Sequence, residues 1–467
     1  MDPALLHTWK KWSPALDPYY AIKVDEVEEL YAPRAQGAAD RLVLRIRRAV
    51  EPERLKILLC GARGSGKTTE MARVAHSLYL EWAPLRIDLA SILPAGSATL
   101  AICVHIGAAA LRALHDRSAQ DQPLAPAAWS AAGRLFGAAL EGLGVGSEAL
   151  ATLLDAMPAV SALVVPKEGA VPAEAAPLVA RGVGAGLKAA GAQVRARAAA
   201  AAAAVSGPLG RYVAPDEMDK AQRVIEGINA ILDELQRHEQ RPILLLVEGL
   251  DKSHQLDDIR LAISQPELLE QIGAPLILTG PIQLRSSPEF SGLPGSLRPE
   301  PMNNIPVLAP PFTDPQVHPA GIDALLDLYT RRRDHFGLPK DLFPPEELAR
   351  AARYSSGVPR EFLTLLDLAG QEALQAGRAR VLKQDLDGAL RERRLTLTGA
   401  YTEARVLLLY RVLQRGLPGD GPEADELLFT NYIAAYPNGE LWYRPNELLV
   451  DSVRERGALL ERLAGGS

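Results

Sequence analysis

The sequence has few of the features that mark disulfide frameworks, membrane spans or basic nucleic-acid-binding surfaces. Its 467 residues include only two cysteines, Cys60 and Cys103, and no signal segment opens the chain, so we expect a reducing, cytoplasmic location. The longest uncharged stretches, 156–166 and 198–210, are shorter than the ~18 to 20 residues that cross a bilayer, so no membrane span is predicted. Basic and acidic residues number 51 and 57, so any nucleic-acid binding must be local.

A glycine-rich loop lies between an apolar run typical of a buried strand and a segment that favours helix. Gly61, Gly64 and Gly66 allow positive φ values and close backbone approach, so successive N–H groups can face a polyphosphate. Lys67 would neutralise the β and γ phosphates, and Thr68 would give its hydroxyl to Mg²⁺. The sequence therefore predicts a nucleotide-phosphate site built from Gly61, Ala62, Arg63, Gly64, Ser65, Gly66, Lys67, Thr68 and Thr69.

Two carboxylates stand just after the most apolar predicted strand, Ile243–Val247. In a parallel sheet the carboxyl ends of the strands present groups to the ligand. We assign Glu248 to the Mg²⁺ shell and Asp251 to activation of the attacking water. Thr279, at the end of the next predicted strand, would bond the γ-phosphate or the lytic water.

Several arginines have candidate roles around this site. Arg285 and Arg298 follow in predicted loops near the sheet edge, and each fits either an arginine finger for a neighbouring subunit's nucleotide or a salt bridge at the rim. Arg360 opens a predicted helix after Gly357-Val-Pro and would face the phosphates if a helical bundle closes over the sheet, so it would report nucleotide state. Arg34 is either a contact to the base or part of surface packing.

Strands that alternate with helices after the glycine loop predict an α/β fold: a P-loop NTPase parallel sheet with helices on both faces, followed by an α-helical lid and a C-terminal winged-helix-like domain. The last strand of the sheet is expected at Asn304–Leu308, and Asn438-Gly439 predicts a hairpin in the C-terminal domain. An Ala- and Gly-rich insertion at about 118–215 is either a partner-binding arm or a passive spacer. The expected domains are a lead-in at 1–50, the P-loop ATPase domain with its insertion at 51–315, the lid at 316–395 and the winged-helix-like domain at 396–467.

Together these motifs resemble an AAA+ ATPase of the origin-recognition type, and they are similar to the signal-transduction (STAND) ATPases, over about 30–116 and 216–467. Glu248 stands where that family normally has Asp, and about a hundred residues are inserted before its strand, which favours nucleotide binding over fast turnover. The resemblance implies ATP and Mg²⁺ as cofactors. It also implies Lys67 and Thr68 as the Walker A pair, Glu248 and Asp251 as the Walker B acids, Thr279 as first sensor, Arg298 as finger and Arg360 as second sensor.

Three functions fit these residues. The first is an ATP-dependent molecular switch whose lid and C-terminal domain follow the nucleotide state. The second is a DNA-binding loader or regulator, although residues 388–467 have balanced charge with one small cluster, Arg391, Arg393 and Arg394. The third is a signalling or defence scaffold in which ATP drives homo-oligomerisation and a protein partner is bound. The sequence does not distinguish ATP from GTP.

Overall fold

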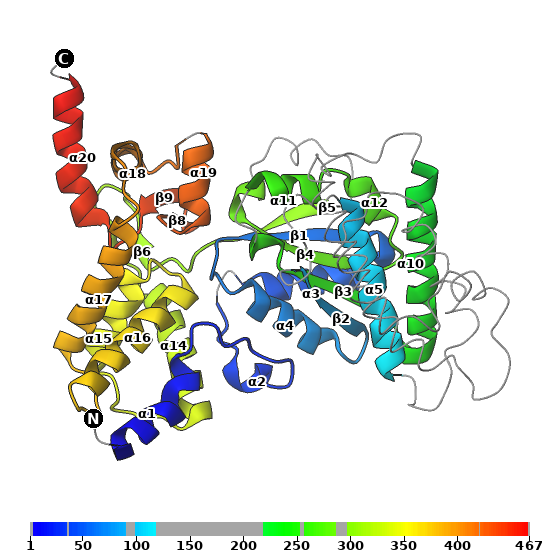
Figure 1. The fold of residues 1–467 in the computed structure, drawn as a ribbon, viewed down its shortest axis with the longest axis horizontal. Helices are drawn as coiled ribbons and strands as arrows, with labels where there is room; N and C mark the ends of the chain where they lie inside the picture. The colour runs from blue at the N-terminus through cyan, green and yellow to red at the C-terminus, as the bar shows by residue number, and fades with distance from the viewer. Residues whose placement is uncertain are drawn as a thin grey trace, which may run out of the picture.

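The computed structural model describes residues 3–34, 37–89, 99–117, 218–252, 256–285, 297–419 and 421–465. The predicted insertion lies outside these residues, so both of its suggested roles stay predictions. Figure 1 shows an α/β part built around one sheet and a mostly helical part that contains both ends of the described chain. Within the described ranges, no helix combines the length and the apolar character that a membrane crossing requires.

A parallel five-stranded sheet forms the centre of the α/β part, with the strand order β2-β3-β4-β1-β5. The first strand is flanked on both sides: Leu58 pairs with Leu278 on one side and with Pro299 on the other. This sheet confirms the predicted α/β class. The strands are β1 (Lys56–Gly61), β2 (Ala83–Asp88), β3 (Ile243–Glu248), β4 (Leu276–Gly280) and β5 (Leu297–Met302).

Helices cover both faces of the sheet, as predicted (Figure 1). Leu58 and Cys60 pack on one face, in the same core as Cys103, whereas Ile57 and Leu59 pack on the other face. Because successive side chains of a strand point to opposite faces, a fully apolar strand such as β1 needs cover on both sides. The first face is covered by α5 (Thr99–Arg117) and α10 (Met218–Glu239), and the second by α3 (Ala38–Arg48) and α4 (Lys67–Leu78).

The position of the last strand corrects the expectation from sequence. The strand predicted at Asn304–Leu308 is not part of the sheet, and β5 lies earlier, at Leu297–Met302. Pro299 and Pro301 obscured it, because proline lacks the N–H that a central strand must donate. They are tolerated because β5 is an edge strand, with a neighbour on one side only among the described strands. Beyond it, β6 (Leu308–Ala309) pairs with β7 (Gln316–Val317).

The predicted helical lid is present and includes an element from the N-terminus. Trp9 and Trp12 of the first helix are buried in the same core as the lid helices. Gly370 lets the helices approach closely, since a Cβ there would lie 2.7 Å from the Trp9 ring. The helices are α1 (Pro3–Leu16), α14 (Pro319–Phe336), α15 (Pro345–Tyr354), α16 (Pro359–Gln375) and α17 (Lys383–Thr398), with the short α2 (Val27–Leu30) beside them.

The C-terminal domain contains the predicted hairpin. Its turn holds Gly439 at φ +101°, a conformation that favours glycine. A further helix follows the hairpin, and its Gly457 lies against Tyr410. The winged-helix character of this arrangement and the domain boundaries stay predictions. The elements are α18 (Glu403–Arg415), α19 (Pro422–Phe429), β8 (Ile433–Tyr436), β9 (Trp442–Pro445) and α20 (Val450–Gly465).

Candidate functional site

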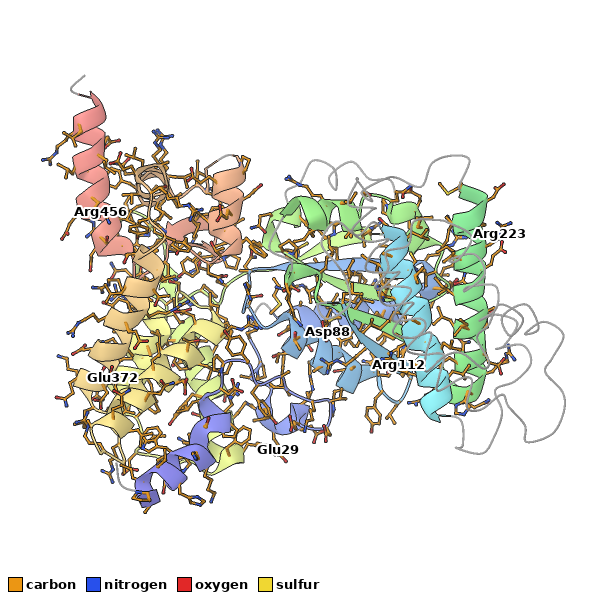
Figure 2. The ribbon with its side chains drawn as sticks, viewed as in Figure 1. Glu29, Asp88, Arg112, Arg223, Glu372 and Arg456 are labelled. Carbon is orange, nitrogen blue, oxygen red and sulfur yellow. The ribbon has the colours of Figure 1, made fainter. Side chains whose placement is uncertain are left out.

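A cleft of about 620 Å³ lies where the carboxyl ends of the sheet strands face the lid. Asp88, labelled in Figure 2, lines it at the end of β2. The segment between α1 and α3 lines another wall, and helices α14 and α16 of the lid contribute the wall opposite the sheet. The cleft brings together these residues predicted from sequence: Arg63, Gly64, Gly66, Lys67, Thr68, Thr69, Glu248, Asp251 and Arg360.

The glycine loop has the geometry of an anion cradle. Gly64 and Gly66 have φ values of +80° and +92°, and a Cβ on Gly64 would lie 2.8 Å from the Cβ of Arg360. Helix α4 begins at Lys67, so its positive end faces the cleft. The buried Ser65 hydroxyl finds no hydrogen-bond partner within the described part of the chain. Backbone N–H groups, a helix N-terminus and an unsatisfied hydroxyl together suit a phosphate group.

Lys67 forms a buried ion pair within this cradle. Its Nζ lies 2.8 Å from Asp251 Oδ2 and donates to the carbonyls of Gly61 and Ala62 at 2.8 and 2.9 Å. Thr279 Oγ1 donates to Asp251 Oδ1 at 3.1 Å. Burial raises the pKa of Asp251, but the charge of Lys67 and the hydrogen bonds from Lys67 and Thr279 outweigh it and hold this pKa below its ordinary value. The structure thus joins three of the predicted groups in one contact network.

Glu248 has a partner that the sequence analysis missed. Arg86, on the neighbouring strand β2, donates to Glu248 Oε1 from Nη2 at 2.8 Å and from Nε at 3.2 Å. Beside this pair, Lys252 Nζ lies 3.0 Å from Asp88. The sequence signal for this contact is an arginine at a polar position of β2. It identifies a partner for Glu248 only if β2 pairs with β3, and the sequence does not show that pairing. Both acids at the β2–β3 end of the cleft are therefore held by side-chain cations.

Arg34 packs across the glycine loop, and a contact of this residue with the base stays a prediction. Its Nη1 donates to the carbonyl of Ser65 at 2.9 Å, and its Nε donates to Glu70 Oε1 at 3.2 Å. Glu70 is fully buried and also accepts from Ala39 N at 2.7 Å and from Tyr31 Oη at 3.3 Å. The sequence analysis did not predict a role for this glutamate. Its hydrogen bonds connect the segment before α3 to the start of α4.

Both C-terminal parts of the chain contact the tip of the loop. The backbone N of Arg360 in the lid donates to the carbonyl of Gly64 at 3.3 Å. Its guanidinium lies over the Tyr19 ring, 5.1 Å from the centroid, and its buried Nε has no partner among the described residues. In the C-terminal domain, Asn431 Nδ2 donates to the carbonyl of Arg63 at 2.7 Å. The loop is therefore held from outside through its backbone carbonyls.

Of the two arginines predicted as possible fingers, Arg298 lies outside this cluster. Arg298 is exposed on β5, opposite Ile57 near the start of β1, and so lies at the far end of the sheet from the cleft. Arg285 ends the short helix η6 (Ile282–Arg285). A finger role for Arg298 therefore requires a second copy of the chain and stays a prediction.

The oxygen donors present fit a magnesium ion that is bound together with a nucleotide. Thr68, Glu248 and Asp251 all line the cleft. Within the described ranges, no group of three or more His, Cys, Asp or Glu residues could hold a metal. Mg²⁺ commonly takes one or two carboxylates and completes its shell with water and substrate phosphates. This donor set therefore suits an ion that arrives with phosphate oxygens.

No family model matches the sequence, and no curated protein matches it. Among solved structures, the chain is similar to the Aeropyrum pernix ORC2 protein in its ADPNP–ADP complexes, with 11% identity, a TM-score of 0.40, and coverage of 97% of this chain and 98% of that one. Cdc6p from Pyrobaculum aerophilum shares 11% identity at a TM-score of 0.38, over 97% and 98% of the two chains. The Aeropyrum pernix ORC1 protein in complex with DNA shares 12% identity at 0.35, over 94% and 98%. The structure shows a parallel sheet with the glycine loop between β1 and α4. This arrangement is the P-loop NTPase fold predicted from the sequence.

Proposed function

We propose that the protein is an ATP-binding and ATP-hydrolysing molecular switch, in which the nucleotide controls the positions of the lid and of the C-terminal domain. One observation carries this proposal: the carbonyls of Arg63 and Gly64 at the loop tip are bonded by Asn431 of the C-terminal domain and Arg360 of the lid. Any shift of the loop around a phosphate chain changes both contacts. A ligand in the cleft therefore acts directly on two distant parts of the chain.

Binding uses backbone and side-chain groups that line the cleft. The N–H groups of the loop and the Lys67 ammonium would meet the phosphates, and Arg34 lies beside them against Ser65. Thr68 and Glu248 would hold the magnesium ion, which supplies charge neutralisation of the phosphate oxygens when bound. Lys67 has to leave Asp251 to reach the phosphates, so binding frees that carboxylate.

Hydrolysis would use Asp251 as the group that orients and deprotonates water. Lys67 holds its pKa below the ordinary value before the nucleotide binds, and the Thr279 hydroxyl fixes one of its oxygens. Charged Arg360, whose Nε lacks a partner among the described residues, would gain one in a γ-phosphate. The lid would then hold tightly with ATP and loosen with ADP.

Steady-state ATP hydrolysis and binding of a non-hydrolysable ATP analogue test this proposal. We expect slow turnover by the wild type and, for Lys67→Ala, an affinity lower by on the order of 10- to 100-fold, because one charged contact to the phosphates is lost. The control is Arg454→Ala, an exposed residue on α20. Equal affinity in wild type and Lys67→Ala would disprove the site.

The DNA-binding alternative has weak support from the arginine cluster that precedes the C-terminal domain, on lid helix α17. Arg393 donates to both oxygens of Glu361 at 2.6 and 2.9 Å, and Arg394 donates to the carbonyl of Leu448 at 3.1 Å. Two members of the predicted cluster are thus engaged inside the protein. We infer that the switch acts through a protein partner or through other copies of the chain.

A further inference from the structure

A second cavity, also of about 620 Å³, lies beside the edge strand β5, away from the nucleotide cleft. It is open along helix α3 and along the start of β1, where Leu55 lines it. Its lining, among the described residues, is dominated by one residue type. Five arginines line it: Arg41, Arg45, Arg48, Arg54 and Arg298. We call this cavity the arginine groove.

A buried carboxylate organises the arginine groove. Glu300 of β5, only 5% exposed, accepts from Arg41 Nε at 2.7 Å and pairs with Arg45 Nη2 at 2.9 Å. The two oxygens of one side chain thus fix one guanidinium group each, while both arginines remain partly exposed, at 45% and 38%. Arg41 also donates from Nη2 to the carbonyl of Pro301 at 3.3 Å, whereas Arg45 Nη1 has no hydrogen-bond partner among the described residues, so Arg45 keeps donors for a ligand. Such fixed donors lose little conformational entropy on binding.

The groove keeps a surplus of positive charge. Arg54 pairs with Glu51 at 3.1 Å, whereas exposed Arg48 and Arg298 have no ion-pair partner in the described part of the chain. Five arginines against Glu51 and Glu300 leave a surplus of three charges. The whole chain has a net charge of −6, so this cluster is a local feature and not a result of basic composition.

The spacing of the arginines suits a repeating anion. Arg41, Arg45 and Arg48 lie four and three residues apart on one face of α3, which places them about 6 and 4.5 Å apart along the helix axis. Planar guanidinium groups bind phosphate oxygens in pairs. Leu44, 55% exposed, and Val50, 96% exposed, line the same groove and offer apolar contact to sugars or bases.

The edge strand itself argues against a polypeptide that would bind by extending the sheet. Pro299 and Pro301 lack the N–H groups that an added strand would need.

We propose that the arginine groove binds the phosphate backbone of a nucleic acid, independently of the nucleotide cleft. Single-stranded and duplex forms present the same phosphodiester chemistry, and the test separates them.

Fluorescence anisotropy of the full chain with a labelled single strand and its duplex, at low and moderate salt, tests the proposal. The variant is Arg48→Ala with Arg54→Ala, and the matched control is Arg411→Ala with Arg454→Ala, which removes equal charge from exposed positions of α18 and α20. Binding of an ATP analogue, measured in parallel, confirms that each variant is folded.

We expect the groove variant to bind nucleic acid roughly tenfold more weakly than wild type, with a salt slope smaller by about 2, because two phosphate contacts are lost. The control variant should bind as wild type does. A larger loss with the single strand or with the duplex identifies the preferred form. Absence of binding by wild type in low salt, equal losses in both variants, or displacement by poly-glutamate as effectively as by unlabelled nucleic acid would each overturn the proposal.

Discussion

Lys67 Nζ lies 2.8 Å from Asp251 Oδ2, so the two groups with the most direct expected roles in phosphate chemistry neutralise each other. Both side chains are largely shielded from water, and among the described residues neither has a second charged partner as close. A nucleotide therefore has to exchange one ion pair for another, which moderates affinity and couples binding to the release of Asp251.

Asp251→Asn keeps the shape of the side chain and removes its ability to accept a proton. We expect this variant to bind an ATP analogue within a few-fold of wild type and to hydrolyse ATP at least about 100-fold more slowly, the usual range for loss of a general base. Single-turnover hydrolysis, measured beside equilibrium binding, separates the two effects. Normal turnover would instead assign catalysis to Glu248.

The lowered pKa of Asp251 also predicts how stability depends on pH. Its ordinary value of about 3.9 applies in the unfolded chain, and the folded value is lower, so ionised Asp251 stabilises the fold above about pH 4, and this contribution disappears as pH falls through the folded-state pKa. Urea unfolding of wild type and Asp251→Asn over this range measures it. The difference in free energy of unfolding should shrink on acidification, and a constant difference would contradict the assignment.

Arg86→Gln removes the charge that pairs with Glu248 and keeps a polar side chain at this position of β2. Arg86 is about one-third exposed, so the pair is partly screened, and we expect half-saturation by Mg²⁺ in nucleotide binding to occur at up to about fivefold lower concentration. Fluorescence of a labelled ATP analogue during Mg²⁺ titration gives this value, and the affinity in EDTA shows whether the site is intact. An unchanged or higher half-saturating concentration would mean that Glu248 does not meet the metal.

Asn431→Ala removes the hydrogen bond from the C-terminal domain to the glycine loop. Because one neutral hydrogen bond is worth about 1 kcal/mol, we expect nucleotide affinity to change by about fivefold. Asn438→Ala is the matched control, since its Nδ2 donates at the same 2.7 Å to the carbonyl of Leu308, away from the loop. Calorimetric titration compares the two variants. Equal effects would show that the Asn431 contact is only structural.

The sequence contains local information about the site. The glycine loop, the strand before it and the acids at the end of β3 and just beyond it were all recognisable, because each depends on neighbours in the chain. The predicted start of the lid helix at Arg360 is also one residue from its observed start at Pro359, since proline suits the first turn of a helix.

Contacts between segments far apart in the chain could not be read in this way. Arg86 meets Glu248 only because β2 lies next to β3, across 162 positions of sequence. The burial of Trp9 among the lid helices likewise depends on tertiary packing. Strand β5 was misplaced because proline disfavours a central strand but is tolerated in an edge strand. Only the topology shows that β5 is an edge strand.

The two cysteines share one core, and this has a practical consequence. Cys60 lies in β1 directly before Gly61, and Cys103 lies within α5. Both side chains are 0% exposed, and burial raises the pKa of Cys103 to about 12. Thiol reagents attack the exposed thiolate, so neither residue reacts until the packing between β1 and α5 opens. The rate at which the native protein is alkylated therefore measures spontaneous opening of this layer, with no label introduced and no residue replaced.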